Sequence, residues 1–106
     1  MGGVNLLVDG NVDKMWVVCL TYDANVTATN TTQESDITVK GVKLGDLVFV
    51  NKPSHSAGVG IVNARVKAAD TVSVQYVNAT GSGVNPAAEL YCFFIVRPNQ
   101  LLSVVP

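Results

Sequence analysis

The residues Thr71-Val72-Ser73-Val74-Gln75-Tyr76-Val77-Asn78 alternate between apolar and polar side chains over the length of a strand. Successive side chains of a β-strand point to opposite faces, so Val72, Val74 and Tyr76 are predicted to share one buried face. The polar residues between them, Thr71, Ser73 and Gln75, are predicted to face water. This stretch therefore predicts a half-buried strand.

The rest of the chain repeats the β signal. Twenty residues are Val and only two are Glu, and β-branched residues fit a pleated sheet better than a helix. Short apolar runs alternate with Gly, Asn, Asp and Pro at close intervals, which favours a sandwich or barrel. We expect a β-sandwich of about eight short antiparallel strands, with a jelly roll as one form of it. The expected strands are 4–8, 15–21, 26–30, 37–40, 47–51, 59–66, 71–78 and 89–96.

Two of these strands are apolar on both faces, because MWVVCL (15–20) and LYCFFIV (90–96) contain no alternating polar residue. Both faces of such a strand need cover. One face is expected to join the core and the other to meet a neighbouring subunit. The alternative is that both strands are central in a small barrel.

Charged residues make up 14% of the 106-residue chain, whereas about 25% is usual. A small domain has much surface for its volume and needs more charge rather than less. We infer that other protein chains cover part of the surface. The alternative is that Ser, Thr and Asn supply the missing polarity.

The same composition argues against several classes of protein. The net charge is −1 and the seven basic residues are scattered singly, which does not suit a nucleic-acid binder. Apolar runs are too short to cross a bilayer, and the chain does not start like a signal peptide. Cys19 and Cys92 lie in apolar runs and are expected to be buried free thiols, with a disulfide as the alternative if their strands are neighbours.

Residues that would carry catalysis are sparse. The single histidine, His55, lies between Ser54 and Ser56 in an expected loop, without the strand-turn-helix setting of a nucleophilic serine. Neither a Cys-x-x-Cys pair nor a calcium-loop pattern is complete. We expect no enzymatic activity, no catalytic residue, no metal and no cofactor.

The length fits one domain over residues 1–106. We expect a short N-terminal arm over 1–14 and an apolar tail over 98–106, whose last six residues read LLSVVP. Apolar ends tend to dock on their own domain or to add a strand to a partner.

Several segments resemble small structural proteins of tailed bacteriophages. They are ITVKGVKLGDLVFVNKP (37–53), NARV (63–66), AADTV (68–72), NATG (78–81) and NPAA (85–88). The resemblance covers roughly 36–98, about six tenths of the chain, and is a pattern of turns between strands rather than a catalytic motif. It implies a virion component, either a capsid decoration (cement) protein or a fibre-associated protein. Residues 1–33 carry no such resemblance, so the choice between the two stays open.

Composition and resemblance together favour a cement protein that binds the major capsid protein at capsomer junctions. It would be made in the host cytoplasm and act on the capsid surface of the virion. We expect a homo-oligomer, a trimer before a dimer, without nucleic-acid or membrane partners. The alternative is a carbohydrate- or receptor-binding module of a fibre or tail, with Tyr22, Asp23 and Tyr76 as candidates. The residues expected at interfaces are Met15, Trp16 and Phe93, and in the tail Leu101, Leu102 and Val104.

Overall fold

A computed structural model describes residues 12–25 and 27–99. These residues contain no helix and form six strands in two antiparallel sheets. The strands are β1 (Val12–Tyr22), β2 (Thr31–Thr38), β3 (Leu47–Asn51), β4 (Val59–Ala68), β5 (Thr71–Asn78) and β6 (Glu89–Pro98).

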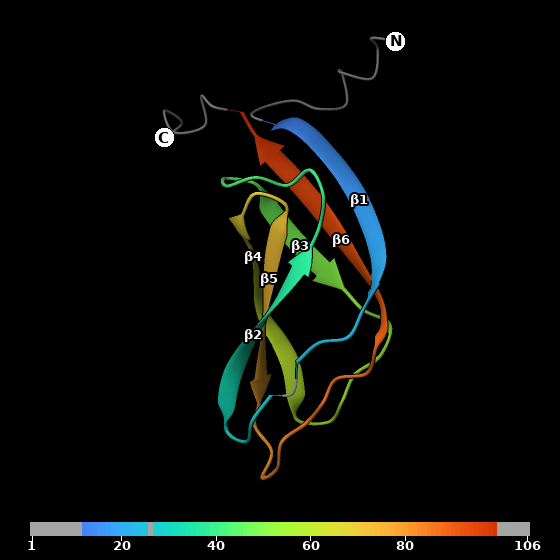
Figure 1. Cartoon of the computed structure of the whole chain (residues 1–106), viewed down its shortest axis with the longest axis vertical. Helices are drawn as coiled ribbons and strands as arrows, with labels where there is room; N and C mark the ends of the chain where they lie inside the picture. Colours follow the sequence, from blue (N-terminus) through green and yellow to red (C-terminus); the bar gives the residue numbers. More distant parts are fainter. Residues whose placement is uncertain (1–11, 26, 100–106) are drawn as a thin grey trace.

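Each sheet has three strands. The first has the order β1-β6-β3 and the second the order β2-β5-β4, so β6 and β5 are the two central strands. In Figure 1, β1 (blue) and β6 (red) run side by side along one side of the molecule. The second sheet, in which β5 lies between β2 and β4, lies beside them. The β1–β6 pairing is regular from Lys14 to Tyr22, after one irregularity between Val12 and Lys14.

Both sheets contribute to one core. The predicted inner residues of β5, which are Val72, Val74 and Tyr76, are almost completely buried. They pack with Tyr91, Phe93 and Ile95 of β6 in the same apolar cluster. The hydroxyls of Tyr76 and Tyr91 are hydrogen-bonded to each other across the two sheets. Burial raises the pKa of Tyr76 above its ordinary value, and this hydrogen bond is the second cause of the rise. The phenol of Tyr76 therefore stays protonated.

The alternation of β5 is confirmed on its inner side, but its outer side is less wet than the sequence predicts. Ser73 is 1% exposed. It is paired with Asp36 of β2 and Arg65 of β4. Because β5 is the central strand, residues of both neighbouring strands flank the small serine.

The strands 47–51 and 71–78 have the predicted bounds, and β1, β4 and β6 extend beyond the predicted ones. Expected strand 26–30 is wrong, since the described part of it shows only a bridge between Thr27 and Val84. Expected strand 37–40 overlaps β2 only at Ile37 and Thr38, because β2 begins at Thr31 and ends at Thr38. Expected strand 4–8 lies outside the described residues. The expected arm over 1–14 overlaps β1, which begins at Val12, and β6 includes Pro98.

Tight turns hold the ends of the two sheets together. Asp70 closes the β4–β5 hairpin with a φ of 59°, a conformation that aspartate tolerates better than most residues. Its carboxylate accepts a hydrogen bond from Gly41 N–H (2.8 Å), and its carbonyl accepts one from Val39 N–H. The hairpin therefore anchors the segment that leads from β2 into β3.

Candidate interaction surface

The outer face of the β1-β6-β3 sheet carries no charged side chain in the rows of paired residues that span all three strands, and Asn51 is the one polar side chain in those rows. Residues paired across antiparallel strands point to the same side of the sheet. One row contains Met15, Val96 and Leu47. The next rows contain Val17, Phe94 and Phe49, and then Cys19, Cys92 and Asn51. Leu90 extends this face beside Thr21. We call this surface the apolar face.

The side chains of the apolar face are open to solvent. Six of the eight large hydrophobic residues that are exposed in the described chain belong to it, with exposed fractions from 41% to 63%: Met15, Val17, Leu47, Phe49, Leu90 and Phe94. The rings of Phe49 and Phe94 stack at 6.1 Å between centroids. From these fractions, the six side chains expose on the order of 600 Å² together, the upper end of the largest patch on a typical monomer.

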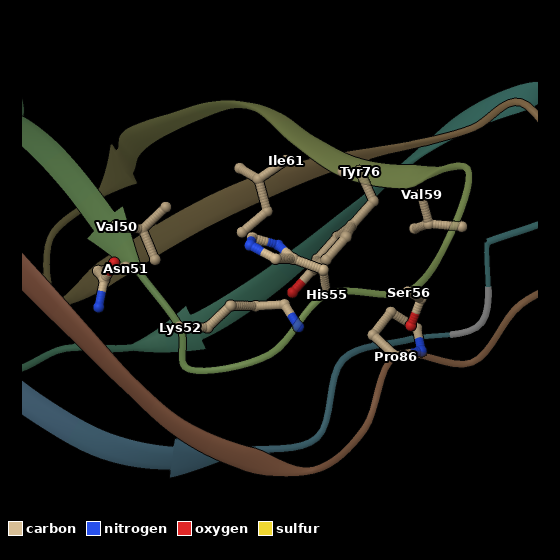
Figure 2. Close-up of a pocket in the computed structure, with 10 residues that line it drawn as sticks. Val50, Asn51, Lys52, His55, Ser56, Val59, Ile61, Tyr76 and Pro86 are labelled. Atoms are coloured by element: carbon tan, nitrogen blue, oxygen red, sulfur yellow. The ribbon is translucent and has the colours of Figure 1, made fainter.

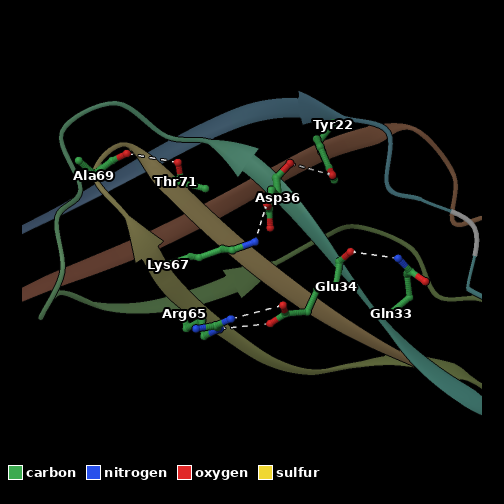
Figure 3. A network of polar contacts seen from close by, with 8 residues as sticks. All are labelled: Tyr22, Gln33, Glu34, Asp36, Arg65, Lys67, Ala69 and Thr71. Atoms are coloured by element: carbon green, nitrogen blue, oxygen red, sulfur yellow. Dashed lines mark hydrogen bonds and ion pairs between the residues drawn. The ribbon is translucent and has the colours of Figure 1, made fainter.

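The outer face of the other sheet is charged. Arg65 of β4 forms an ion pair with Glu34 of β2 at 3.2 Å, and Lys67 forms one with Asp36 at 2.9 Å (Figure 3). Hydrogen bonds from Arg65 and Lys67 are the largest causes that lower the pKa values of the Glu34 and Asp36 carboxyls. The molecule therefore presents one hydrated outer sheet face and one apolar one.

The charged pairs of this sheet lie at its two ends and on the side opposite the apolar face. Asp46 and Arg97 form a bidentate pair, with N–O distances of 2.9 and 2.8 Å, near the start of β3. Trp16 lies under two cations, Lys14 Nζ at 4.5 Å and Arg97 Cζ at 5.2 Å from the ring centroid. At the other end, Lys52 Nζ lies 2.5 Å from a Glu89 carboxylate oxygen. The rows between these ends carry no charged side chain.

A cavity of about 340 Å³ opens near the end of β3 (Figure 2). Apolar side chains from both sheets line it, including Val50 and Ile61, together with His55 and the buried Tyr76. Ser54, beside His55, donates its hydroxyl proton to Glu89 at 2.7 Å. The hydroxyl of Ser54 is therefore directed to a carboxylate rather than to the histidine.

The predicted interface residues have different positions. Met15 lies on the apolar face. Trp16 points the other way, is half-buried and packs against the core. Phe93 is 0% exposed and belongs to the core, so the exposed aromatic of β6 is its neighbour Phe94. Phe49, Leu47 and Leu90 were not predicted as interface residues. The alternation of side chains along a strand assigns them to this face once the pairing register is known. Leu101, Leu102 and Val104 lie outside the described residues.

Two of the three candidates for a carbohydrate site, Tyr22 and Tyr76, lie against Tyr91 rather than on an open surface. The ring of Tyr22 packs edge-on against Tyr91 at 5.6 Å, and its hydroxyl donates to the Asp36 carbonyl at 3.1 Å. Tyr76 is buried and hydrogen-bonded to Tyr91. Asp23 alone of the three is exposed.

The cysteines differ from the expectation of buried free thiols. β1 and β6 are neighbours, Cys19 is paired directly with Cys92, and the two form a disulfide. Cys19 is exposed and Cys92 is half-buried, so the disulfide lies on the apolar face. The disulfide was the stated alternative if the two strands were neighbours, but the sequence alone does not give the order of the strands in the sheet.

Within residues 12–25 and 27–99, no group of three or more His, Cys, Asp or Glu side chains is placed to hold a metal ion. The same residues form no helix that is long and apolar enough to cross a membrane. No protein-family model, curated protein or solved structure matches the chain.

Proposed function

We propose that this chain is a non-enzymatic structural protein of a phage virion, a cement protein whose apolar face docks on the capsid protein. It acts as a homo-oligomer, with a trimer as the first candidate and a dimer as the second. The observation that carries this proposal is the apolar face. A patch of this size on so small a domain marks a surface for protein contacts.

The chemistry of cementing agrees with these features. A protein that stabilises a shell performs no reaction and needs buried area at the junctions between subunits. Several weakly binding copies, linked in one oligomer, bind far more tightly than one copy because later contacts form at high effective concentration. The absence of charged side chains from the apolar face suits this role, since charged residues are depleted at the centre of interfaces.

We further propose that the two sheets form a reduced jelly roll. The first strand pairs with the last (β1 with β6), and the second with the last but one (β2 with β5). A long antiparallel hairpin that rolls up into two sheets gives these pairings. The eight strands of a full jelly roll would require one further hairpin beside the six strands described.

Paired leucine substitutions test the docking surface. Leu47 lies on the apolar face and is 51% exposed, whereas Leu44 is 70% exposed in the loop before β3. Leu47→Asp introduces a charge that a protein interface would have to desolvate, so we expect binding to assembled heads to weaken at least tenfold. Leu44→Asp is the control and is expected to bind like the wild type. Co-sedimentation with purified heads measures both.

Circular dichroism and thermal melting confirm that both variants fold. Equal binding by folded Leu47→Asp and Leu44→Asp would contradict docking through this face. Failure of the wild-type chain to sediment with heads would overturn the cement function itself.

A further inference from the structure

The four edge strands of the two sheets are not equally protected against pairing with another strand. β2 carries the carboxylates of Glu34 and Asp36, and β3 has only five residues. The β4 pairing is irregular at two places, between Ile61 and Asn63 and between Val66 and Ala68. Charges, short length and bulges are the devices that keep edges from pairing. Each of these three edge strands therefore has a device that protects it.

β1 lacks such a device over most of its length. It is the longest strand, and it forms the outer edge of its sheet along one side of the molecule (Figure 1). From Lys14 to Tyr22 its register is regular. That stretch contains no proline, and Lys14 at its start is its only charged residue.

The spacing of Cys19 and Cys92 shows which backbone groups of β1 are not paired with β6. Their Cα atoms are 4.0 Å apart. In an antiparallel ladder, pairs that share no backbone hydrogen bond are about 4.5 Å apart and hydrogen-bonded pairs about 5.5 Å. Cys19 therefore directs its N–H and C=O away from β6. The period of two assigns the same direction to Met15, Val17 and Thr21.

We propose that two copies of this chain associate by antiparallel pairing of their β1 edges. This inference rests on the proposed function, in which copies of the chain associate, and names the edge through which they do so. In a two-fold register centred on Val18, Met15 lies opposite Thr21 of the partner subunit, and Val17 opposite Cys19 of the partner subunit. All four N–H groups that point away from β6 in each copy are then paired, which makes this register the best matched one.

The pairing also joins the two apolar faces. Side chains of directly paired residues share one side of a sheet, so a continuous six-stranded sheet places both faces on the same side. Together they present on the order of 1,200 Å², which exceeds the about 800 Å² per partner that a standard interface buries. The register places Asp13 opposite Asp23 of the partner subunit at each end, a like-charge pair that opposes the pairing. The stretch from Met15 to Thr21 between these ends carries no charge. The geometry favours a dimer as the unit of assembly.

Substitution of Val17 tests the edge. Val17→Pro removes an N–H that faces away from β6, and proline is tolerated at such edge positions. Val17→Thr keeps the N–H and the β-branched shape, and is the matched control. In analytical ultracentrifugation we expect the wild type and Val17→Thr at twice the 11.2 kDa chain mass. We expect Val17→Pro at the chain mass, with self-association weakened at least tenfold.

Amide hydrogen exchange on the wild type supplies a readout that needs no variant. The amides of Met15, Val17, Cys19 and Thr21 are expected to exchange more slowly as protein concentration rises. Those of Trp16, Val18 and Leu20, which bond to β6, are expected to be slow at every concentration. A wild-type monomer or trimer, an unchanged mass for folded Val17→Pro, or fast exchange of the four amides in the assembled protein would overturn edge pairing. Head binding by the wild type would survive each of these results, so they leave the cement function standing.

Discussion

At the scale of single residues, Asp46 is the best anchored charge in the described chain. Its side chain is 1% exposed, and it accepts two hydrogen bonds from Arg97 and one from Lys43 N–H. Hydrogen bonding from Arg97 is the largest cause that lowers the pKa of this carboxyl. A buried pair of this kind is costly to break, because the remaining charge loses its partner. Asp46 thereby ties the start of β3 to the end of β6.

We predict that Asp46→Asn lowers the free energy of unfolding by about 2 kcal/mol at neutral pH, since the amide cannot pair with the Arg97 charge. Asp36→Asn, which removes a half-exposed ion pair, is expected to change it by less than about 1 kcal/mol. Urea unfolding measures both. Equal effects of the two substitutions would contradict the assignment of a special role to Asp46.

The contribution of Asp46 depends on pH in a direction that its pKa fixes. Folding lowers the pKa of this carboxyl. Its contribution to the free energy of unfolding is therefore complete above the pKa of the unfolded state, about 3.9. It is lost as the pH falls from there through the folded pKa. The unfolding free energies of wild type and Asp46→Asn should therefore converge in strong acid.

At this scale, the sequence alone does not show which of two adjacent apolar residues lies in the core. Phe93 and Phe94 are adjacent, and the period of two places them on opposite faces, but both faces of their strand are apolar. Nothing local says which face is the core. The core position of Phe93 follows from the packing of β6 against Val72, Val74 and Tyr76 of the other sheet, which requires the tertiary arrangement. The same missing strand order left the pairing of the cysteines open.

At the scale of elements, the link into β4 depends on a close backbone approach. Gly58 has a φ of 78°, and a Cβ there would lie 2.5 Å from Cγ2 of Thr80. The Thr80 hydroxyl shares its one proton between two acceptors, Oδ1 of Asn78 at 2.6 Å and the Ser82 carbonyl oxygen at 2.7 Å. Rotation of Thr80 away from a new methyl group would break these bonds. The position therefore requires glycine for two independent reasons.

We predict that Gly58→Ala destabilises the fold by about 2 kcal/mol, from the left-handed backbone and the contact with Thr80. Gly60→Ala, two residues into β4, meets no atom within 4 Å of the new Cβ. It is expected to be neutral or stabilising by about 0.5 kcal/mol, because alanine restricts the unfolded chain. Thermal melting of the pair checks this, and equal melting temperatures would contradict it.

Strands were predictable where their patterns were one-sided or strongly apolar. β5 and β3 have the predicted bounds, since turn residues flank both runs. β2 was found only in part, because Thr31 to Asp36 is polar and resembles a loop. In the structure this segment is an edge strand, whose buried positions are Ser35 and Ile37. An edge position exposes enough of a strand to hide its alternation, and the sequence does not state which strands are edges.

At the scale of the whole molecule, the low charge content has a definite location. The charged pairs concentrate on the outer face of β2-β5-β4 and at the ends of the other sheet, and the apolar face carries none. The composition predicted that apolar surface is left uncovered in a single chain, and the exposed residues of the apolar face agree with that. The protein that covers this face in the assembled state is our proposal.

Hydroxyl-radical footprinting of virions against the isolated chain tests that central claim most directly. We expect Met15, Phe49 and Phe94 to be oxidised in the isolated protein and shielded in particles, whereas exposed Leu44 reacts in the isolated chain and serves as the reference outside the face. Equal oxidation of the three residues in both samples, or absence of the chain from purified particles, would contradict the account.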